Sequence, residues 1–174
     1  MTNSSPPVSL LTIRQLDQVL ALNNANIPAV SELTEEEFRF DLKHCLYPLM
    51  ITDVGSNELL AFCVTFGPGA PYQSSNYEWF SDRYENFVYL DRIAVASDHQ
   101  NKGLGAALYE ALEKKMIADQ LTTALACEVN LQPANPGSLR FHHRLGFEEV
   151  GQHEPKPGFI VSMLVKKVGE IPLP

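Results

Sequence analysis

The feature that most constrains this chain is a turn with two glycines, placed between an apolar segment and an amphipathic one. Residues 87–95 are mostly apolar and predict a buried strand, whereas residues 106–119 repeat apolar side chains at helical spacing. The turn Gln100–Ala106 lies between them, and a further apolar segment, 123–129, predicts a strand after the helix. This order of strand, turn, helix and strand predicts an α/β fold.

The turn also has the composition of an anion-binding site. Gly103 and Gly105 let the backbone approach a bulky anion without interference from a Cβ atom, and the first amides of the following helix point toward that anion. A pyrophosphate fits this description, and a tight turn without a ligand is the alternative. A P-loop needs Gly-Lys-Ser/Thr, but Lys102 precedes both glycines, and a dinucleotide fingerprint needs Gly or Ala where Leu108 stands. Both of these nucleotide sites are therefore disfavoured.

The other segments complete a mixed pattern of strands and helices. Thr34-Glu35-Glu36-Glu37 is a capping box, which predicts the start of a helix that ends near Cys45. Residues 67–86 open with Gly67-Pro68-Gly69-Ala70-Pro71 and predict a long loop, a kind of segment that often carries function. Hydrophobic periodicity predicts further strands at 8–13, 49–52, 59–66, 147–153 and 158–168, and helices at 16–22 and 136–145.

Composition removes several classes of function. The chain has 174 residues, the usual size of one domain, and a formal net charge of -8, so no nucleic-acid partner is expected. Cys45, Cys63 and Cys127 are odd in number and scattered, which predicts buried thiols without a disulfide framework or a metal site. No apolar run approaches the roughly 18 residues of a membrane span, so we expect no membrane partner and a cytoplasmic location.

Two motifs in the right order resemble a known family. Gln-x-x-Gly-x-Gly/Ala after a strand of the type Leu90-Asp91-Arg92-Ile93-Ala94-Val95 is similar to the acetyl-CoA signature of the GCN5-related N-acetyltransferases (GNAT). About 30 residues later, the segment from Asn135 to Phe147 resembles the second motif of that family. The chain is also similar to a group of bacterial predicted acetyltransferases that share its NNANIPAVS segment, a resemblance that names no acceptor.

The resemblance implies a fold and a donor. It covers about residues 8–168 and implies one N-acetyltransferase domain over 1–174, with a mixed sheet of about seven strands, a splayed fourth and fifth strand and about four helices. Acetyl-CoA would be the cosubstrate, without a metal. By the resemblance, Gln100 and the backbone of Asn101, Lys102, Gly103, Leu104, Gly105 and Ala106 bind the pyrophosphate. The strand edge of Ile93, Ala94 and Val95 and the side chain of Asn135 would contact the pantetheine arm.

The resemblance also implies candidates for catalysis. Glu128 matches a position at which some members carry a glutamate base, and Asp91 is a second carboxylate near the same gap between strands. The family commonly has a tyrosine acid seven residues after the motif-two asparagine, where this chain has His142. An imidazolium with a pKa near 6.5 can protonate a thiolate, although His142 is equally readable as a structural residue and His143 lies beside it.

The acceptor is the least constrained part. The 67–86 segment offers aromatic side chains, of which Tyr72 and Trp79 are candidates to bind a cationic amine or to pack the loop. We expect a small-molecule or amino-acid acceptor, with a protein N-terminus or lysine as the alternative. A CoA-binding sensor without turnover is a further alternative, and the family makes a homodimer a reasonable expectation. The sequence distinguishes neither the acceptor nor acetyl from a longer acyl group.

Overall fold

A computed structural model describes residues 7–120 and 123–169 of the chain. Its residues form two compact units. The first unit runs to Thr65 and also includes Arg92–Lys115, whereas the second consists of Phe66–Asp91 and the chain from Met116 onward. The single domain expected from the sequence stays a prediction.

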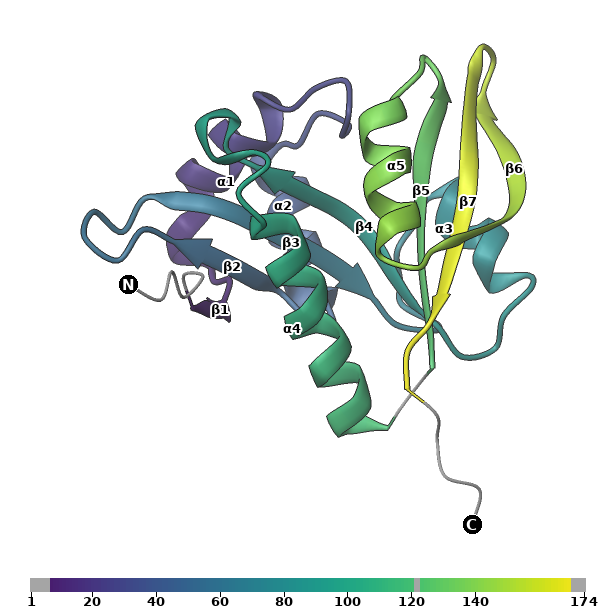
Figure 1. The fold of residues 1–174 in the computed structure, drawn as a ribbon, viewed down its shortest axis with the longest axis horizontal. Helices are drawn as coiled ribbons and strands as arrows, with labels where there is room; N and C mark the ends of the chain where they lie inside the picture. The colour runs from purple at the N-terminus through teal and green to yellow at the C-terminus, as the bar shows by residue number, and fades with distance from the viewer. Residues whose placement is uncertain (1–6, 121–122, 170–174) are drawn as a thin grey trace. The chain divides into compact units, whose positions relative to one another are not determined.

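The strands form a mixed seven-stranded sheet with the order β1-β2-β3-β4-β5-β7-β6 (Figure 1). β4 and β5 are parallel in the register Val88↔Leu125 and Tyr89↔Ala126, and the other strand pairs with a recorded register are antiparallel. The expected α/β class with about seven strands is confirmed. The strands are β1 (Val8–Leu10), β2 (Leu49–Thr52), β3 (Leu59–Phe66), β4 (Val88–Val95), β5 (Ala124–Gln132), β6 (Glu148–Lys156) and β7 (Phe159–Lys167).

Five α-helices accompany the sheet within the described residues, one more than expected. They are α1 (Leu16–Asn24), α2 (Glu35–His44), α3 (Ser75–Ser81), α4 (Leu104–Asp119) and α5 (Pro136–Arg144). None of these helices has the length and apolar character that crossing a membrane requires, as far as residues 7–120 and 123–169 go.

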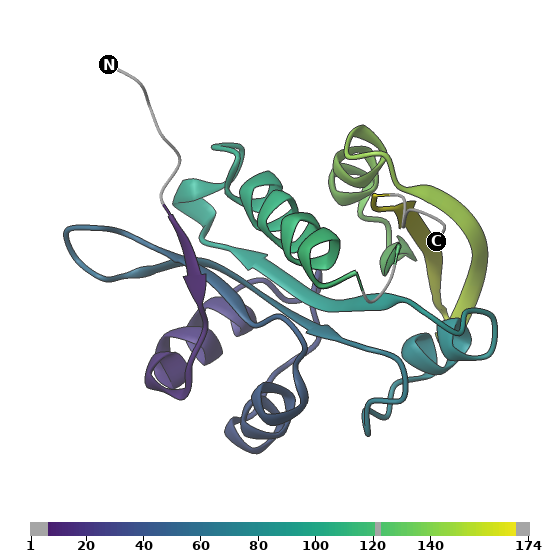
Figure 2. The same cartoon turned by 90° about the horizontal axis from the view of Figure 1, so that it is seen from below.

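The first unit packs helices on both faces of its strands. Figure 2 shows α1 and α2 on one side of β2 and β3 and the start of α4 on the other side. β3 is buried along its whole length, as expected for a strand covered on both faces. The predicted capping box is present, because the Thr34 side chain accepts from Glu37 N and the Glu37 carboxylate accepts from Thr34 N at 2.8 Å.

The second unit is built on β5, β7 and β6, which are antiparallel neighbours. α5 packs against β5, and α3 packs against β6 and lies behind β7 in Figure 1. α3 corrects the expected loop at 67–86: residues 75–81 form a helix whose N-cap is Ser74. Only seven residues are helical, too few for the hydrophobic spacing to be recognised.

Candidate active site

The glycine turn of the first unit has a backbone that few residues other than glycine adopt. Asn101 has φ 59° and Gly103 has φ 83°, both in the left-handed region, with Lys102 outside that region between them. Alternating backbone conformations of this kind turn successive amides toward one side and form an anion-binding concavity. A Cβ atom added at Gly103 would meet nothing within 4 Å, so the space in front of the turn is open.

α4 begins directly after this turn. Its backbone bonding starts with Ala107 N, which donates to Gly103 O at 2.9 Å. The amides of Leu104, Gly105 and Ala106 precede that bond and therefore belong to the unpaired first turn, where the helix dipole is positive. The turn can accordingly hold a phosphate group.

The strand that leads into the turn ends at Val95. Val95 O accepts from Asn26 Nδ2 at 3.4 Å and from Gln100 Nε2 at 3.5 Å, so Gln100 helps to hold the turn against the end of β4. Ile93 is half-buried and Ala94 is 2% exposed. These contacts all lie within the first unit. The expected contact of Ile93, Ala94 and Val95 with pantetheine therefore stays a prediction.

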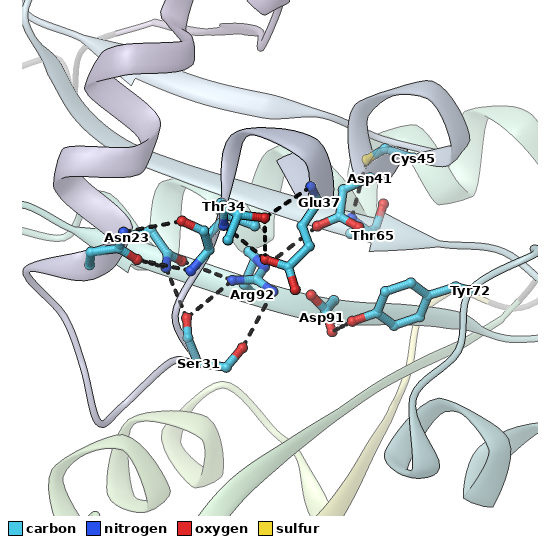
Figure 3. Close-up of polar contacts among 12 residues, drawn as sticks. Asn23, Ser31, Thr34, Glu37, Asp41, Cys45, Thr65, Tyr72, Asp91 and Arg92 are labelled. Carbon is cyan, nitrogen blue, oxygen red and sulfur yellow. Dashed lines mark hydrogen bonds and ion pairs between the residues drawn. The ribbon is translucent and has the colours of Figure 1, made fainter. Parts of the chain in front are cut away.

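A buried arginine of β4, which the sequence interpretation did not single out, organises the first unit (Figure 3). Arg92 Nη1 donates to Asn23 Oδ1 at 3.1 Å, and Nη2 donates to Ser31 Oγ at 3.4 Å. Its Nε lies 3.9 Å from Asp41 Oδ2, and the two side chains are only 8% and 5% exposed. Arg92 thus ties α1, α2 and the segment between them to β4.

In the second unit, Glu128 of β5 holds a buried carboxyl group. Its Oε1 accepts from Tyr89 Oη at 3.0 Å and from Asn76 Nδ2 at 2.9 Å. Oε2 is buried without a hydrogen-bond partner among the described residues. Burial, and next the charge of Asp91, raise the pKa of Glu128 to about 8, so this carboxyl group can take up and release a proton near neutral pH.

Asp91 of β4 lies in the same unit and is held by an aromatic side chain. Tyr72 Oη donates to Asp91 Oδ1 at 2.5 Å (Figure 3). The Tyr72 ring stacks on Phe66 with 4.0 Å between centroids. Burial and the neighbouring carboxylates Glu128 and Asp91 also raise the pKa of Tyr89 well above its ordinary value, so Tyr89 stays a hydrogen-bond donor.

α3 supplies one expected and one unexpected residue. Trp79 packs over Gly151 of β6, and the Arg83 guanidinium lies 3.9 Å from its ring centroid. Asn76, which the sequence interpretation missed, contacts Glu128 directly. Its only sequence signal is its place in the short helix that follows Ser74.

α5 places the motif-two residues. Asn135 is its N-cap, and Asn135 Oδ1 accepts from Ser138 N at 3.2 Å. His142 is 4% exposed and its Nδ1 donates to Ser138 O at 2.8 Å, while Phe141 and Phe147 contact its ring edge-on. Burial lowers the pKa of His142, which favours the neutral imidazole at pH 7. His143 Nδ1 lies 3.1 Å from Phe147 O.

Comparison with known proteins gives the family. Residues 16–147 match the sequence model of the acetyltransferase (GNAT) family, and the chain therefore belongs to it. A 106-residue stretch is 31% identical to L-methionine sulfoximine/L-methionine sulfone acetyltransferases of Pseudomonas aeruginosa and Pseudomonas paraeruginosa, covering 61% of this chain. The chain thus spans about half the length of these curated relatives, since the match covers 54% of each.

Solved structures share the fold. The ribosomal-protein-S18-alanine N-acetyltransferase from Escherichia coli aligns with a TM-score of 0.71 at 19% identity, over 95% of each chain. Arabidopsis thaliana NAA60 in complex with acetyl-CoA aligns with a TM-score of 0.73 at 16% identity, over 93% of this chain and 98% of that one. At such identities the likeness concerns the fold alone.

Proposed function

We propose that this protein transfers an acetyl group from acetyl-CoA to the amine of a small molecule or amino acid. The observation that carries the proposal is the buried Glu128 carboxyl group. Its pKa of about 8 makes its ionised form a stronger base than an ordinary carboxylate, and this form can accept a proton from an amine. Family membership and the small-molecule acetyltransferase relatives support it. The complex of NAA60 with acetyl-CoA supports the choice of donor.

The proposal assigns pyrophosphate binding to the turn Asn101–Ala106. Its left-handed backbone, the open space at Gly103 and the first-turn amides of α4 fit a diphosphate. In the second unit, Asn135 Oδ1 serves the helix cap, which leaves its Nδ2 as the donor for the pantetheine arm. The expected contacts of Ile93, Ala94 and Val95 with pantetheine stay predictions for the first unit.

The chemistry is a direct attack. An arriving ammonium first gives one proton to the ionised Glu128 carboxylate, which leaves a neutral nitrogen. This nitrogen forms the new bond to the acetyl carbon while the carbon–sulfur bond breaks, and its second proton passes to solvent. Tyr89 and Asn76 hold the Glu128 carboxyl group, and the Asp91 carboxylate favours the cationic form of an arriving amine. CoA leaves as a thiolate and takes a proton from solvent.

This proposal gives His142 a structural part instead of the expected acid role. A buried imidazole whose Nδ1 proton is bonded within its own helix is poorly suited to donate as an imidazolium. The expected aromatic contacts of Tyr72 and Trp79 are likewise read as packing, Tyr72 in holding Asp91 and Trp79 in covering Gly151. Cytoplasmic location and a homodimer stay predictions.

The test is release of free thiol from acetyl-CoA across a panel of amines and amino acids. Glu128→Gln keeps the shape of the side chain but cannot accept a proton, so we expect turnover to fall about 100-fold or more with acetyl-CoA affinity unchanged. Glu149→Gln on β6 is the matched control and should keep near-normal turnover. Equal turnover in Glu128→Gln and the unmodified protein would remove Glu128 as the base.

A further inference from the structure

The second unit contains a set of polar atoms that the protein itself does not satisfy. Over the described residues, three buried side-chain atoms have no hydrogen-bond partner: Asn76 Oδ1, Glu128 Oε2 and His153 Nε2. Buried polar atoms are nearly always paired, with protein groups, water or a ligand, so these three atoms indicate where polar groups of a ligand bind.

Strand register places two of these residues on one face of the sheet. Glu128 pairs with Met163 and Met163 pairs with Gly151, so these three side-chain positions share a face. His153 lies two residues after Gly151, and its partner is Val161, two residues before Met163. Since side chains alternate along a strand, His153 projects from the same face as Glu128.

α3 covers that same face. Asn76 donates to Glu128 Oε1 at 2.9 Å, and a Cβ atom added at Gly151 would lie only 2.7 Å from Trp79 Cζ2. One contact is with β5 and the other is with β6, and both show that α3 lies on the same face of the sheet. Asn76 Oδ1 and Glu128 Oε2 therefore lie between α3 and the sheet, and His153 projects from the same face of the sheet on β6.

The hydrogen-bonding character of each atom indicates which ligand group could be its partner. Asn76 turns its Nδ2 toward the Glu128 carboxyl group, so its outward atom is an acceptor that needs an N–H donor. Glu128 Oε2 meets an amine in either protonation state, as carboxylate to ammonium or as carboxylic acid to neutral nitrogen. His153 Nε2 can donate or accept according to its tautomer, and it lies away from the other two: the Cα atoms of Glu128 and His153 are about 12 Å apart by strand geometry.

We infer that the acceptor is a small amine with a second hydrogen-bonding group several bonds from its nitrogen, recognised at Asn76 and Glu128 through the amine and at His153 through the second group. This inference rests on the proposed function and adds a specificity residue to it. A site built to hydrogen-bond a polar group discriminates against an analogue that lacks the group, because His153 is then left buried and unpaired.

L-Methionine sulfone and L-methionine provide the test, because they share the amine, carboxylate and chain length and differ in the sulfone oxygens. We expect kcat/KM for thiol release to favour the sulfone by about tenfold in the unmodified protein. His153→Leu should abolish this preference by lowering kcat/KM for the sulfone, with little change for methionine. His153→Gln, which keeps a hydrogen-bonding group, should retain part of it.

The control is Gln152→Leu, which alters the adjacent β6 residue on the opposite face and should keep the preference. If His153→Leu does not fold, His153→Phe removes the same nitrogen with a ring in its place. Transfer with an unchanged preference in the His153→Leu variant would overturn the inference and leave the proposed function standing. Absence of thiol release with these and all other amines would overturn the proposed function and the inference with it.

Discussion

Glu128 is a carboxyl group in a position where an ordinary strand residue would be apolar. Its neighbours on β5, Cys127 and Val129, are 1% and 4% exposed. A buried carboxyl group is costly unless it is neutral or well bonded, and here one oxygen has two donors and the other has none among the described residues. A buried carboxyl group with a raised pKa is typical of functional sites, and this supports the proposal that Glu128 transfers a proton.

The raised pKa has a consequence for stability. Glu128 has a pKa of about 8 in the folded protein against an ordinary value of 4.5, so the folded protein holds a proton that the unfolded chain has released between these values. The resulting stabilisation is complete below pH 4.5 and is lost as the pH rises through 8. We therefore expect Glu128→Gln to gain stability relative to the unmodified protein as the pH rises from 5 to 9, by on the order of a few kcal/mol.

Urea denaturation at several pH values checks this expectation. The exposed Glu85 provides the control, because Glu85→Gln should show no comparable trend. If Glu128→Gln and the unmodified protein differ in free energy of unfolding by the same amount at every pH, then Glu128 has an ordinary pKa.

At the residue scale the sequence identifies groups by motif and misses those that only folding brings together. The Gly103 turn was a candidate because of its two glycines between a strand and a helix, and Glu128 was a candidate because of the resemblance to the family. Asn76 and His153 belong to no motif. Asn76 meets Glu128 only in the folded chain, and the face on which His153 lies follows from the pairing of β6 with β7, so periodicity carries no signal for either residue. Alternation along the strand did not determine the face of the sheet on which the Asp91 side chain lies. In the structure, this side chain lies on the face where Tyr72 donates a hydrogen bond to it.

Among the elements, β4 depends on Arg92 for its attachment to α1 and α2. Removing one partner of a buried ion pair leaves the other charge uncompensated, so we expect Arg92→Met to lower the free energy of unfolding by about 3–5 kcal/mol. Arg39 forms an exposed pair with Glu35 at 2.8 Å, and Arg39→Met should cost less than about 1 kcal/mol. Urea denaturation of both variants checks the contrast, and equal losses would show that the Arg92 network is not stabilising.

The packing of α3 on β6 depends on Gly151. A methyl group there would lie 2.7 Å from the rigid Trp79 ring, so we expect Gly151→Ala to cost about 1–3 kcal/mol. Trp79→Leu in the same chain should relieve the clash, which makes the double variant more stable than the sum of the single effects predicts. A thermal or urea denaturation cycle measures this coupling, and strict additivity would place Trp79 away from Gly151.

The element pattern was predicted well where periodicity is long. The hairpin strands 49–52 and 59–66 and the late helix and strands agree with the structure to within three residues. α3 was missed because a seven-residue helix between turn-forming segments spans only two turns. The same helix carries Asn76 and Trp79, so the missed element was also the one that forms one wall of the proposed acceptor site.

At the scale of the whole molecule, a fold shared with the family carries a candidate site whose residues are particular to this chain. Family membership rests on a match over residues 16–147, and the sheet order agrees with the expected fold class. We propose that recognition of the acceptor depends on Asn76, Glu128 and His153. We propose that donor binding depends on the turn at Gly103, and without donor binding no acyl transfer occurs.

Calorimetric titration of acetyl-CoA into the unmodified protein, Gly103→Glu and Gly69→Glu tests the central claim most directly. Gly103 and Gly69 have φ of 83° and 69° and open space around them, so both substitutions impose a similar backbone strain. Only a carboxylate at position 103 would repel the pyrophosphate. We predict binding to the unmodified protein and Gly69→Glu and its loss in Gly103→Glu; equal affinity in all three, or no binding to the unmodified protein, would contradict the account.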